Sequence, residues 1–166
     1  MLDGAPLEID IVTCASRAAL PPTAKLTQAC LQAIGITASV SIGEWGANND
    51  AIASGAADIH LQAWGTAPQG DPSYFPETII GTGSGSHVGG YSNPELDALL
   101  ADGRQTFDDA ARRAIYDRVQ AIIAEDVALI AVFHASQVSV GRTGLTGFTV
   151  HPAETYWMNN GVALDE

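Results

Sequence analysis

The first 64 residues alternate between strand-like and helix-like segments, and this alternation restricts the fold more than any other feature of the sequence. Residues 7–11 alternate apolar with polar side chains, which is the two-residue period of a strand with one buried face, and this strand is expected to run to about Thr13. A helical pattern over 23–34 ends at a glycine, a second strand pattern covers 36–45, and a short helix over 48–55 leads to a third strand over 58–64. This order predicts an α/β unit with a largely parallel sheet.

The third strand leads into the longest irregular stretch of the chain. Glycines and prolines interrupt any regular pattern from Trp64 to Tyr91. A helix then starts cleanly, with Asn93 as its N-cap and Pro94 as its first residue. Because loops of this length inside a domain are usually functional or disordered, and this one contains aromatic, acidic and imidazole side chains, we expect a site in it. The residues concerned are Trp64, Asp71, Tyr74, His87 and Tyr91.

Two helices and one further strand are expected after this loop. Helical patterns cover 94–105 and 108–126, and the second has Asp108 and Asp109 at its positive N-terminal end. The segment Ile130–Val140 is too continuous in β-branched and apolar residues for a helix, so it predicts an added antiparallel strand, or two strands with a bend. The absence of repeats and linkers in a chain of 166 residues predicts a single domain.

The composition excludes several classes of partner. A net charge of −12, with only seven Lys and Arg residues, argues against binding to nucleic acid or an anionic membrane, because clustered basic residues bind phosphates. The 46% hydrophobic content against 16% charged residues indicates a folded protein. No apolar run reaches membrane-spanning length, and no signal peptide precedes the first strand. Cys14 and Cys30 leave a disulfide open, although buried free thiols are the simpler interpretation.

No catalytic motif stands out. The glycine-rich run 81–90 lacks the Lys-Ser/Thr pair of a phosphate loop, and its serines have no strand-turn-helix context for a nucleophile elbow. The four histidines are too far apart in sequence to form a metal-binding motif among themselves; they are His60, His87, His134 and His151. The sequence therefore does not support an enzyme, although a site dispersed along the chain would escape this test.

Each candidate site residue also has a purely structural interpretation. Trp64 can be a rim aromatic of the core as well as the wall of a pocket. Asp71 before Pro72 is a common turn opener, and His87 among glycines can simply be solvated. Tyr91 can pack against the start of the following helix. The residues alone leave both interpretations open.

A set of residues spread over nearly the whole chain resembles a known family. The most specific part is the segment from Tyr91 to Asp97, Tyr-Ser-Asn-Pro-Glu-Leu-Asp. The other matching residues, in chain order, are Asp3, Gly4, Pro6, Leu7, Gln32, Gly35, Ile36, Trp64, Gly70, Asp71, Pro72, Tyr74, Phe75, Gly90, Asp109, Arg112, Arg113, Tyr116, Gln120, Glu125 and Asp126. This order and spacing resembles the C-terminal lobe of bacterial extracellular solute-binding proteins of family 5, the receptors of ABC importers for peptides, nickel and related small solutes.

The resemblance implies a fold and a site. The implied fold class is α/β, a single lobe of the type II periplasmic-binding-protein kind with a mainly parallel sheet, flanking helices and an added antiparallel strand, formed by residues 1–166. In dipeptide-binding members the aspartate of the Gly-Asp-Pro segment holds the α-amino group of the ligand, and Asp71 occupies that place. In nickel-binding members a loop histidine contacts the metal, and His87 lies in the matching region. The implied ligand-contacting residues are Trp64, Gly65, Thr66, Asp71, Tyr74, His87 and Tyr91.

The resemblance also implies a function. The parent protein is expected to be a two-lobed, non-catalytic receptor that captures a peptide-like or amine-bearing solute outside the cell membrane, in the periplasm or on a lipid anchor, and delivers it to ABC permease subunits. A nickel chelate is the alternative solute, with His87 as one metal ligand, and no cofactor is expected. This chain is then expected to be a fragment without the N-terminal lobe and the signal sequence. Two other hypotheses remain: a small hydrolase or metal-dependent enzyme using Asp71 and His87, and an interaction module that docks through the glycine-rich loop.

Overall fold

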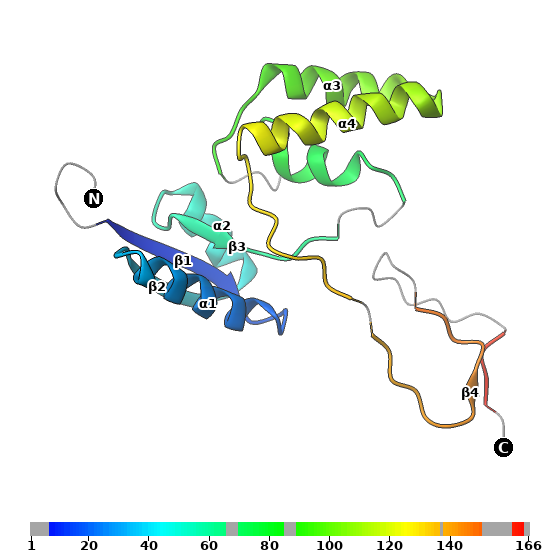
Figure 1. Cartoon of the computed structure of the whole chain (residues 1–166), viewed down its shortest axis with the longest axis horizontal. Coiled ribbons are helices and arrows are strands. Elements are labelled where there is room, and N and C mark those ends of the chain that lie inside the picture. The colour runs from blue at the N-terminus through cyan, green and yellow to red at the C-terminus, as the bar shows by residue number, and fades with distance from the viewer. Residues whose placement is uncertain (1–6, 66–69, 85–88, 137, 151–160, 165–166) are drawn as a thin grey trace. The chain divides into compact units, whose positions relative to one another are not determined.

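The computed structural model describes residues 7–65, 70–84, 89–136, 138–150 and 161–164. The contacts of the chain group into two units (Figure 1). The sheet unit comprises the described residues up to Trp64 together with Gly89 and Gly90, and the helical unit comprises the other described residues. Each unit has its own hydrophobic core. That the chain as a whole forms a single domain stays a prediction.

The sheet unit is a three-stranded parallel sheet with two helices (Figure 1). β1 (Glu8–Cys14) lies in the middle, between β2 (Thr37–Gly43) and β3 (Ile59–Leu61). In the chain, α1 (Leu20–Ala33) connects β1 to β2, and α2 (Trp45–Ala53) connects β2 to β3. The order of elements and the parallel sheet predicted from the sequence are confirmed.

The central strand is covered on both faces. The side chains of Ile11, Val12, Thr13 and Cys14 are all buried, and successive side chains of a strand point to opposite faces. Right-handed crossovers that leave β1 and β2 in opposite directions place α1 and α2 on opposite faces of such a sheet. Because both faces of the sheet are covered, four consecutive residues at the carboxyl end of β1 are buried.

The two faces differ in chemistry. The face under α1 is apolar, and its core consists of Ile11, Ala24 and Ala38. The other face contains Val12 and His60, which are register partners of β1 and β3 and therefore point the same way. An imidazole in this position belongs to the interface with α2 and not to the apolar core.

The helices of the sheet unit begin earlier than predicted. α1 starts at Leu20 instead of Thr23 and includes the two prolines, since the first turn of a helix needs no N–H donors from them. α2 starts at Trp45 instead of Asn48. The glycine stop of α1 is confirmed, because Gly35 has a φ of +83°, which side chains disfavour.

Neither cysteine forms a disulfide: Cys14 is buried and Cys30 is exposed. The interpretation as free thiols is confirmed for both residues, and that of burial only for Cys14, because Cys30 lies on the exposed side of α1.

The helical unit is built on two helices that pack against each other, α3 (Pro94–Gln105) and α4 (Asp109–Glu125) (Figure 1). A short π-helix, Pro76–Ile80, contributes to the same core. The buried core residues are Ile80, Leu96, Leu100, Tyr116, Val119 and Ile122. Both helices agree with the sequence prediction, whereas the π-helix lies within the stretch that was expected to be irregular.

A glycine allows the close approach of α3 and α4. Gly103 is buried in α3, and a Cβ atom at this position would lie 2.7 Å from Oη and 2.9 Å from Cζ of Tyr116. Tyr116 is itself 4% exposed, so it has little room to move. The ring of Tyr116 therefore fills the space that a side chain at position 103 would need.

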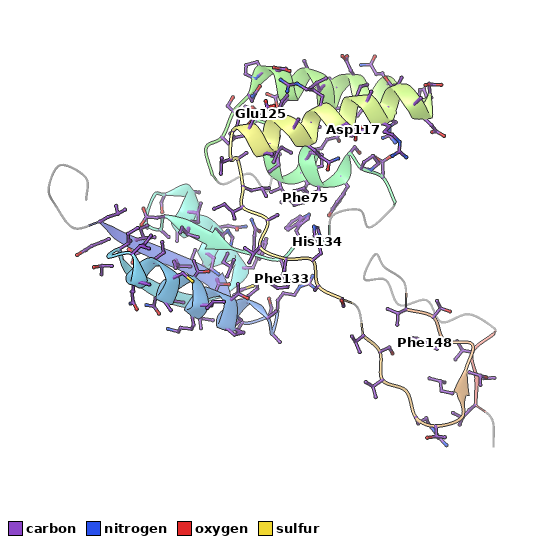
Figure 2. The ribbon with its side chains drawn as sticks, viewed as in Figure 1. Phe75, Asp117, Glu125, Phe133, His134 and Phe148 are labelled. Carbon is purple, nitrogen blue, oxygen red and sulfur yellow. The ribbon has the colours of Figure 1, made fainter. Side chains whose placement is uncertain are left out.

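The predicted strand at Ile130–Val140 is wrong for the described residues of that segment, 130–136 and 138–140, which form neither helix nor strand. Figure 2 shows Phe133 and His134 on this extended segment, and both Phe133 and Ile130 are more than half exposed. Strand-forming composition is insufficient without a neighbouring strand to accept the backbone hydrogen bonds. An antiparallel pair does exist elsewhere, between β4 (Leu145–Thr146) and β5 (Ala163–Leu164).

Candidate ligand site

An aromatic cluster lies at the carboxyl end of the parallel sheet. Trp45 opens α2 directly after β2, His60 lies on β3, and Trp64 follows β3. The ring centroid of Trp45 is 5.5 Å from that of His60 and 5.6 Å from that of Trp64. These separations are those of interacting aromatic rings. Trp64, the first residue of the predicted site, is thus held in the sheet unit by Trp45, at the edge where open α/β sheets bind ligands.

Several polar atoms of this region are buried without a partner among the described residues. They are Nε1 of Trp64, both ring nitrogens of His60 and Nδ2 of Asn48. Asn48 lies one turn after Trp45 on α2 and is 4% exposed. Burial lowers the pKa of His60 below 6.5, because desolvation disfavours the imidazolium form. Buried N–H donors of this kind need an acceptor, and a carbonyl, a carboxylate or a water molecule meets that need.

Asp71, the predicted ammonium anchor, is paired within the helical unit. Nη2 of Arg112 donates to both carboxylate oxygens, at 2.9 Å each. The backbone N–H of Ser73 donates to Oδ1 at 2.8 Å, which is the hydrogen bond of an Asx turn. The hydrogen bonds from Arg112 and Ser73 lower the pKa of Asp71 to about 2. The carboxylate is therefore ionised and engaged with a cation of its own chain.

Tyr91 is engaged at the other end of α4. Its hydroxyl donates to Oδ2 of Asp126 at 2.5 Å, and Nδ2 of Asn93 donates to the same oxygen at 2.8 Å. Oδ1 of Asn93 accepts from the backbone N–H groups of Glu95 and Leu96, which confirms Asn93 as the N-cap of α3. Desolvation, with the Asp126 hydrogen bond second, raises the pKa of Tyr91, and the hydrogen bonds from Tyr91 and Asn93 lower that of Asp126. The Tyr-Ser-Asn-Pro segment thus joins the start of α3 to the end of α4.

The structure does not bring Asp71 and Tyr91 together. Their partners, Arg112 and Asp126, lie near opposite ends of α4, about 20 Å apart along the axis at 1.5 Å per residue. Tyr74 and Gly65 are partly buried, whereas Thr66 and His87 lie outside the described residues. The complete set of ligand-contacting residues therefore stays a prediction.

Some residues of this region were not predicted from the sequence. Trp45 and Asn48 were assigned no role, and Arg112 was noted only as part of the family pattern. The sequence contained one signal for Arg112. The chain has 19 acidic and only seven basic residues, so few of its carboxylates can pair with an arginine or lysine. Which carboxylate Arg112 pairs with depends on the packing of α4, which a sequence does not show.

A polar cavity of about 410 Å³ lies in the helical unit. It is lined by Glu77, Gly81, Thr82, Gly83, Ser84, Asp97, Leu100 and Arg104. Arg104 reaches Glu77 only at 3.7 Å, and Asp97 accepts a hydrogen bond from the backbone N–H of Thr82 at 3.0 Å. Carboxylates, hydroxyls and one guanidinium suit water or small polar groups better than an apolar solute.

Within the described ranges, no group of three or more His, Cys, Asp and Glu side chains is arranged to hold a metal ion. None of the helices formed by the described residues combines the length and the apolar character that crossing a membrane requires.

The chain is similar to known binding proteins, although no family model matches it. The probable di/tripeptide-binding protein 5 of Pseudomonas aeruginosa (strain UCBPP-PA14) is 30% identical over 152 residues, which are 87% of this chain and 29% of that protein. A nickel ABC transporter from Bacillus halodurans is 26% identical, with a TM-score of 0.68 over 76% of this chain and 26% of that chain. The putative peptide binding protein AppA from Clostridium difficile is 21% identical, with a TM-score of 0.81 over 98% of this chain and 34% of that chain.

These likenesses confirm the predicted fold class. The chain spans less than a third of the length of three curated relatives that it matches. The di/tripeptide-binding protein is named for binding and not for catalysis.

Proposed function

Because the chain is homologous to the family 5 solute-binding proteins, we propose that it is the C-terminal lobe of a receptor that captures a peptide-like or amine-bearing small solute for an ABC importer. The observation that carries the proposal is the 30% identity to a di/tripeptide-binding protein over 87% of the chain. The receptor works outside the cell membrane, and its other partners are an N-terminal lobe of the same protein and the permease subunits of the importer. It has no catalytic step.

The exposed segment after α4 supports a longer parent protein. Ile130, Val138 and Val140 are 79%, 78% and 93% exposed, on a stretch whose described residues, 130–136 and 138–140, form no strand. Apolar patches left in water mark surfaces that another part of a protein covers. The N-terminal lobe is the proposed cover, since the curated relative is more than three times as long as the part that this chain matches.

The aromatic cluster of the sheet unit supports a peptide-like solute. The buried N–H groups of Trp64 and Asn48 lack acceptors among the described residues, and peptides are rich in carbonyl acceptors. Trp64 and the following Gly65 are the described residues that we propose as contacts, with Thr66 and His87 as further candidates. A nickel chelate is the second candidate solute, because the nickel ABC transporter is 26% identical to this chain.

Calorimetry on the full-length protein tests the proposal, with Ala-Ala, Ala-Ala-Ala and a nickel–histidine chelate as probes. We expect the peptides to bind and Trp64→Ala to weaken their binding by about 2 kcal/mol, as for a buried aromatic anchor. Phe107→Ala is the matched control, because Phe107 is an aromatic residue 90% exposed in the helical unit.

The other outcomes are also informative. Binding of the chelate alone would make nickel the solute and contradict the peptide proposal. Cleavage of the peptides would favour the enzyme hypothesis, and equal effects of the two substitutions would remove Trp64 from the site.

A further inference from the structure

The side chain of Arg112 connects three parts of the helical unit. Its Nη2 donates to both oxygens of Asp71 at 2.9 Å, and its Nε donates to the carbonyl oxygen of Gly103 at 3.2 Å. Asp71 lies before the π-helix, Gly103 lies in the last turns of α3, and Arg112 belongs to α4. One guanidinium therefore ties two segments of the chain to α4 through charge-assisted hydrogen bonds, with the single nitrogen Nη2 facing both oxygens of Asp71.

Both ends of this contact are held by further interactions. The guanidinium carbon of Arg112 lies 5.2 Å from the ring centroid of Tyr116, within cation–π distance. Tyr116 is buried against Gly103, so the ring is fixed by the packing of α3 and α4. On the other side, the Asx turn to Ser73 orients the Asp71 carboxylate. We call Asp71, Arg112 and the Gly103 carbonyl the arginine clasp.

The charge of Asp71 is neutralised within the clasp. The side chains of Asp71 and Arg112 are 39% and 26% exposed, and together they carry no net charge. A solute ammonium group that bound Asp71 would have to share the carboxylate with the guanidinium, whose Nη2 lies 2.9 Å from both oxygens and whose positive charge would repel it. A neutral pair attracts a cation weakly compared with a free carboxylate.

We infer that Asp71 is a positioning residue, which fixes the start of the helical unit to α4 through Arg112, and not the anchor for the ammonium group of a solute. The inference does not depend on the proposed function. It narrows the range of solutes that the proposed function allows. If Asp71 is taken by Arg112, a preference for amine-bearing solutes has no source in this residue. Recognition of a peptide-like solute then depends on the hydrogen-bond acceptors and backbone groups of that solute.

An NMR titration of the Asp71 side-chain carboxyl tests the inference directly. We compare the wild type with Arg112→Gln and with the matched control Arg118→Gln, which removes an arginine of the same helix that pairs with Glu95. The titration midpoint of Asp71 should lie at about 2 in the wild type and in the control, and should move towards the usual value of 3.8 in Arg112→Gln. Arg112→Lys, which keeps the charge but removes the guanidinium and its Nε–H bond to the Gly103 carbonyl, serves if the glutamine variant does not fold, and should give an intermediate midpoint. An unchanged midpoint in both Arg112 variants would overturn the inference.

A double-mutant cycle on the folding equilibrium provides the second readout. Asp71→Asn and Arg112→Gln should each lower the folding equilibrium constant about tenfold, and the double variant should lose little more than either single variant, because both remove the same contact. Additive losses would contradict the clasp.

Peptide probes separate this result from the proposed function. An excess of Ala-Ala should leave the Asp71 midpoint unchanged, as should N-acetyl-Ala-Ala, which lacks the ammonium group. A further fall of the midpoint with Ala-Ala alone would restore the anchoring role and overturn the inference. A protein that binds no peptide in calorimetry contradicts the proposed function but leaves the dependence of the Asp71 midpoint on Arg112 as it stands.

Discussion

The candidate site residues of the sheet unit and of the helical unit differ in whether their polar groups have a partner within the chain. In the helical unit, Asp71 is paired with Arg112, and Tyr91 and Asn93 both donate to Asp126. In the sheet unit, polar atoms of Asn48, His60 and Trp64 are buried without a partner among the described residues, and in the helical unit this holds for Oε1 of Glu77 and Oη of Tyr116. Within the family pattern, Asp71 and Tyr91 thus connect elements of the chain, whereas Trp64 retains an N–H group that can bind another molecule.

The two units also differ in the capping of their helices. Both helices of the helical unit have side-chain N-caps, Asn93 for α3 and Asp108 for α4. Neither α1 nor α2 of the sheet unit has one. Local sequence therefore specifies the helical unit more strongly, whereas packing against strands defines the helices of the sheet unit.

The largest expected effect tests whether the two units are separate at all. Ile11→Ala and Leu96→Ala each truncate a fully buried side chain, one in each core. Each substitution should lower the free energy of unfolding by about 2–5 kcal/mol. Residue-resolved hydrogen exchange should show faster exchange mainly in the unit that carries the substitution. Equal acceleration in both units would mean that they unfold together, and the division would fail.

A smaller effect compares a buried and an exposed helical glycine. Gly103→Ala should cost about 1–3 kcal/mol, because the new methyl group meets Tyr116 at 2.7 Å. Gly46→Ala in α2 is the control, since a Cβ there meets nothing within 4 Å and alanine is the better helix former. Chemical denaturation of the two variants measures the difference, and a stabilising Gly103→Ala would show that Tyr116 moves freely.

The N-cap of α3 should contribute about 1 kcal/mol to the free energy of unfolding. Asn93→Ala removes the acceptor of two backbone N–H groups as well as a donor to Asp126. Asn93→Ser keeps a capping oxygen and removes the amide donor without placing a second negative charge beside Asp126, so thermal denaturation of the two variants separates the cap from the connection to α4. Identical losses in both variants would assign the whole effect to Asp126.

The smallest expected effect is a dependence on pH that differs between the units. Since burial lowers the folded-state pKa of His60, its neutral form stabilises the sheet unit above pH 6.5, and this contribution is lost as the pH falls through the folded-state value. The lowered pKa of Asp71 places the corresponding loss in the helical unit between about pH 3.8 and about pH 2. Hydrogen exchange as a function of pH should resolve the two windows.

His60→Leu should remove the first window and leave the second unchanged. A sheet unit that keeps the same loss of protection in His60→Leu would mean that another group titrates there.

The sequence determined the local elements of this protein. The period of apolar residues predicted the three parallel strands and the alternation with helices, because that period depends only on which side of an element is buried. Asn93 and Pro94 predicted the start of α3, since a cap and a first-turn proline act within a few residues. The order of residues in the family pattern predicted the relationship to solute-binding proteins.

Only the tertiary structure decided what the candidate residues contact. Ile130–Val140 has the composition of a strand, but the described residues of that segment have no strand to pair with, and a strand requires a neighbour that its own sequence cannot supply. Asp71 could hold a ligand, open a turn or pair with an arginine as far as its neighbours in sequence show. The packing of α4 places Arg112 beside it, because contacts between residues far apart in the chain depend on how whole helices pack.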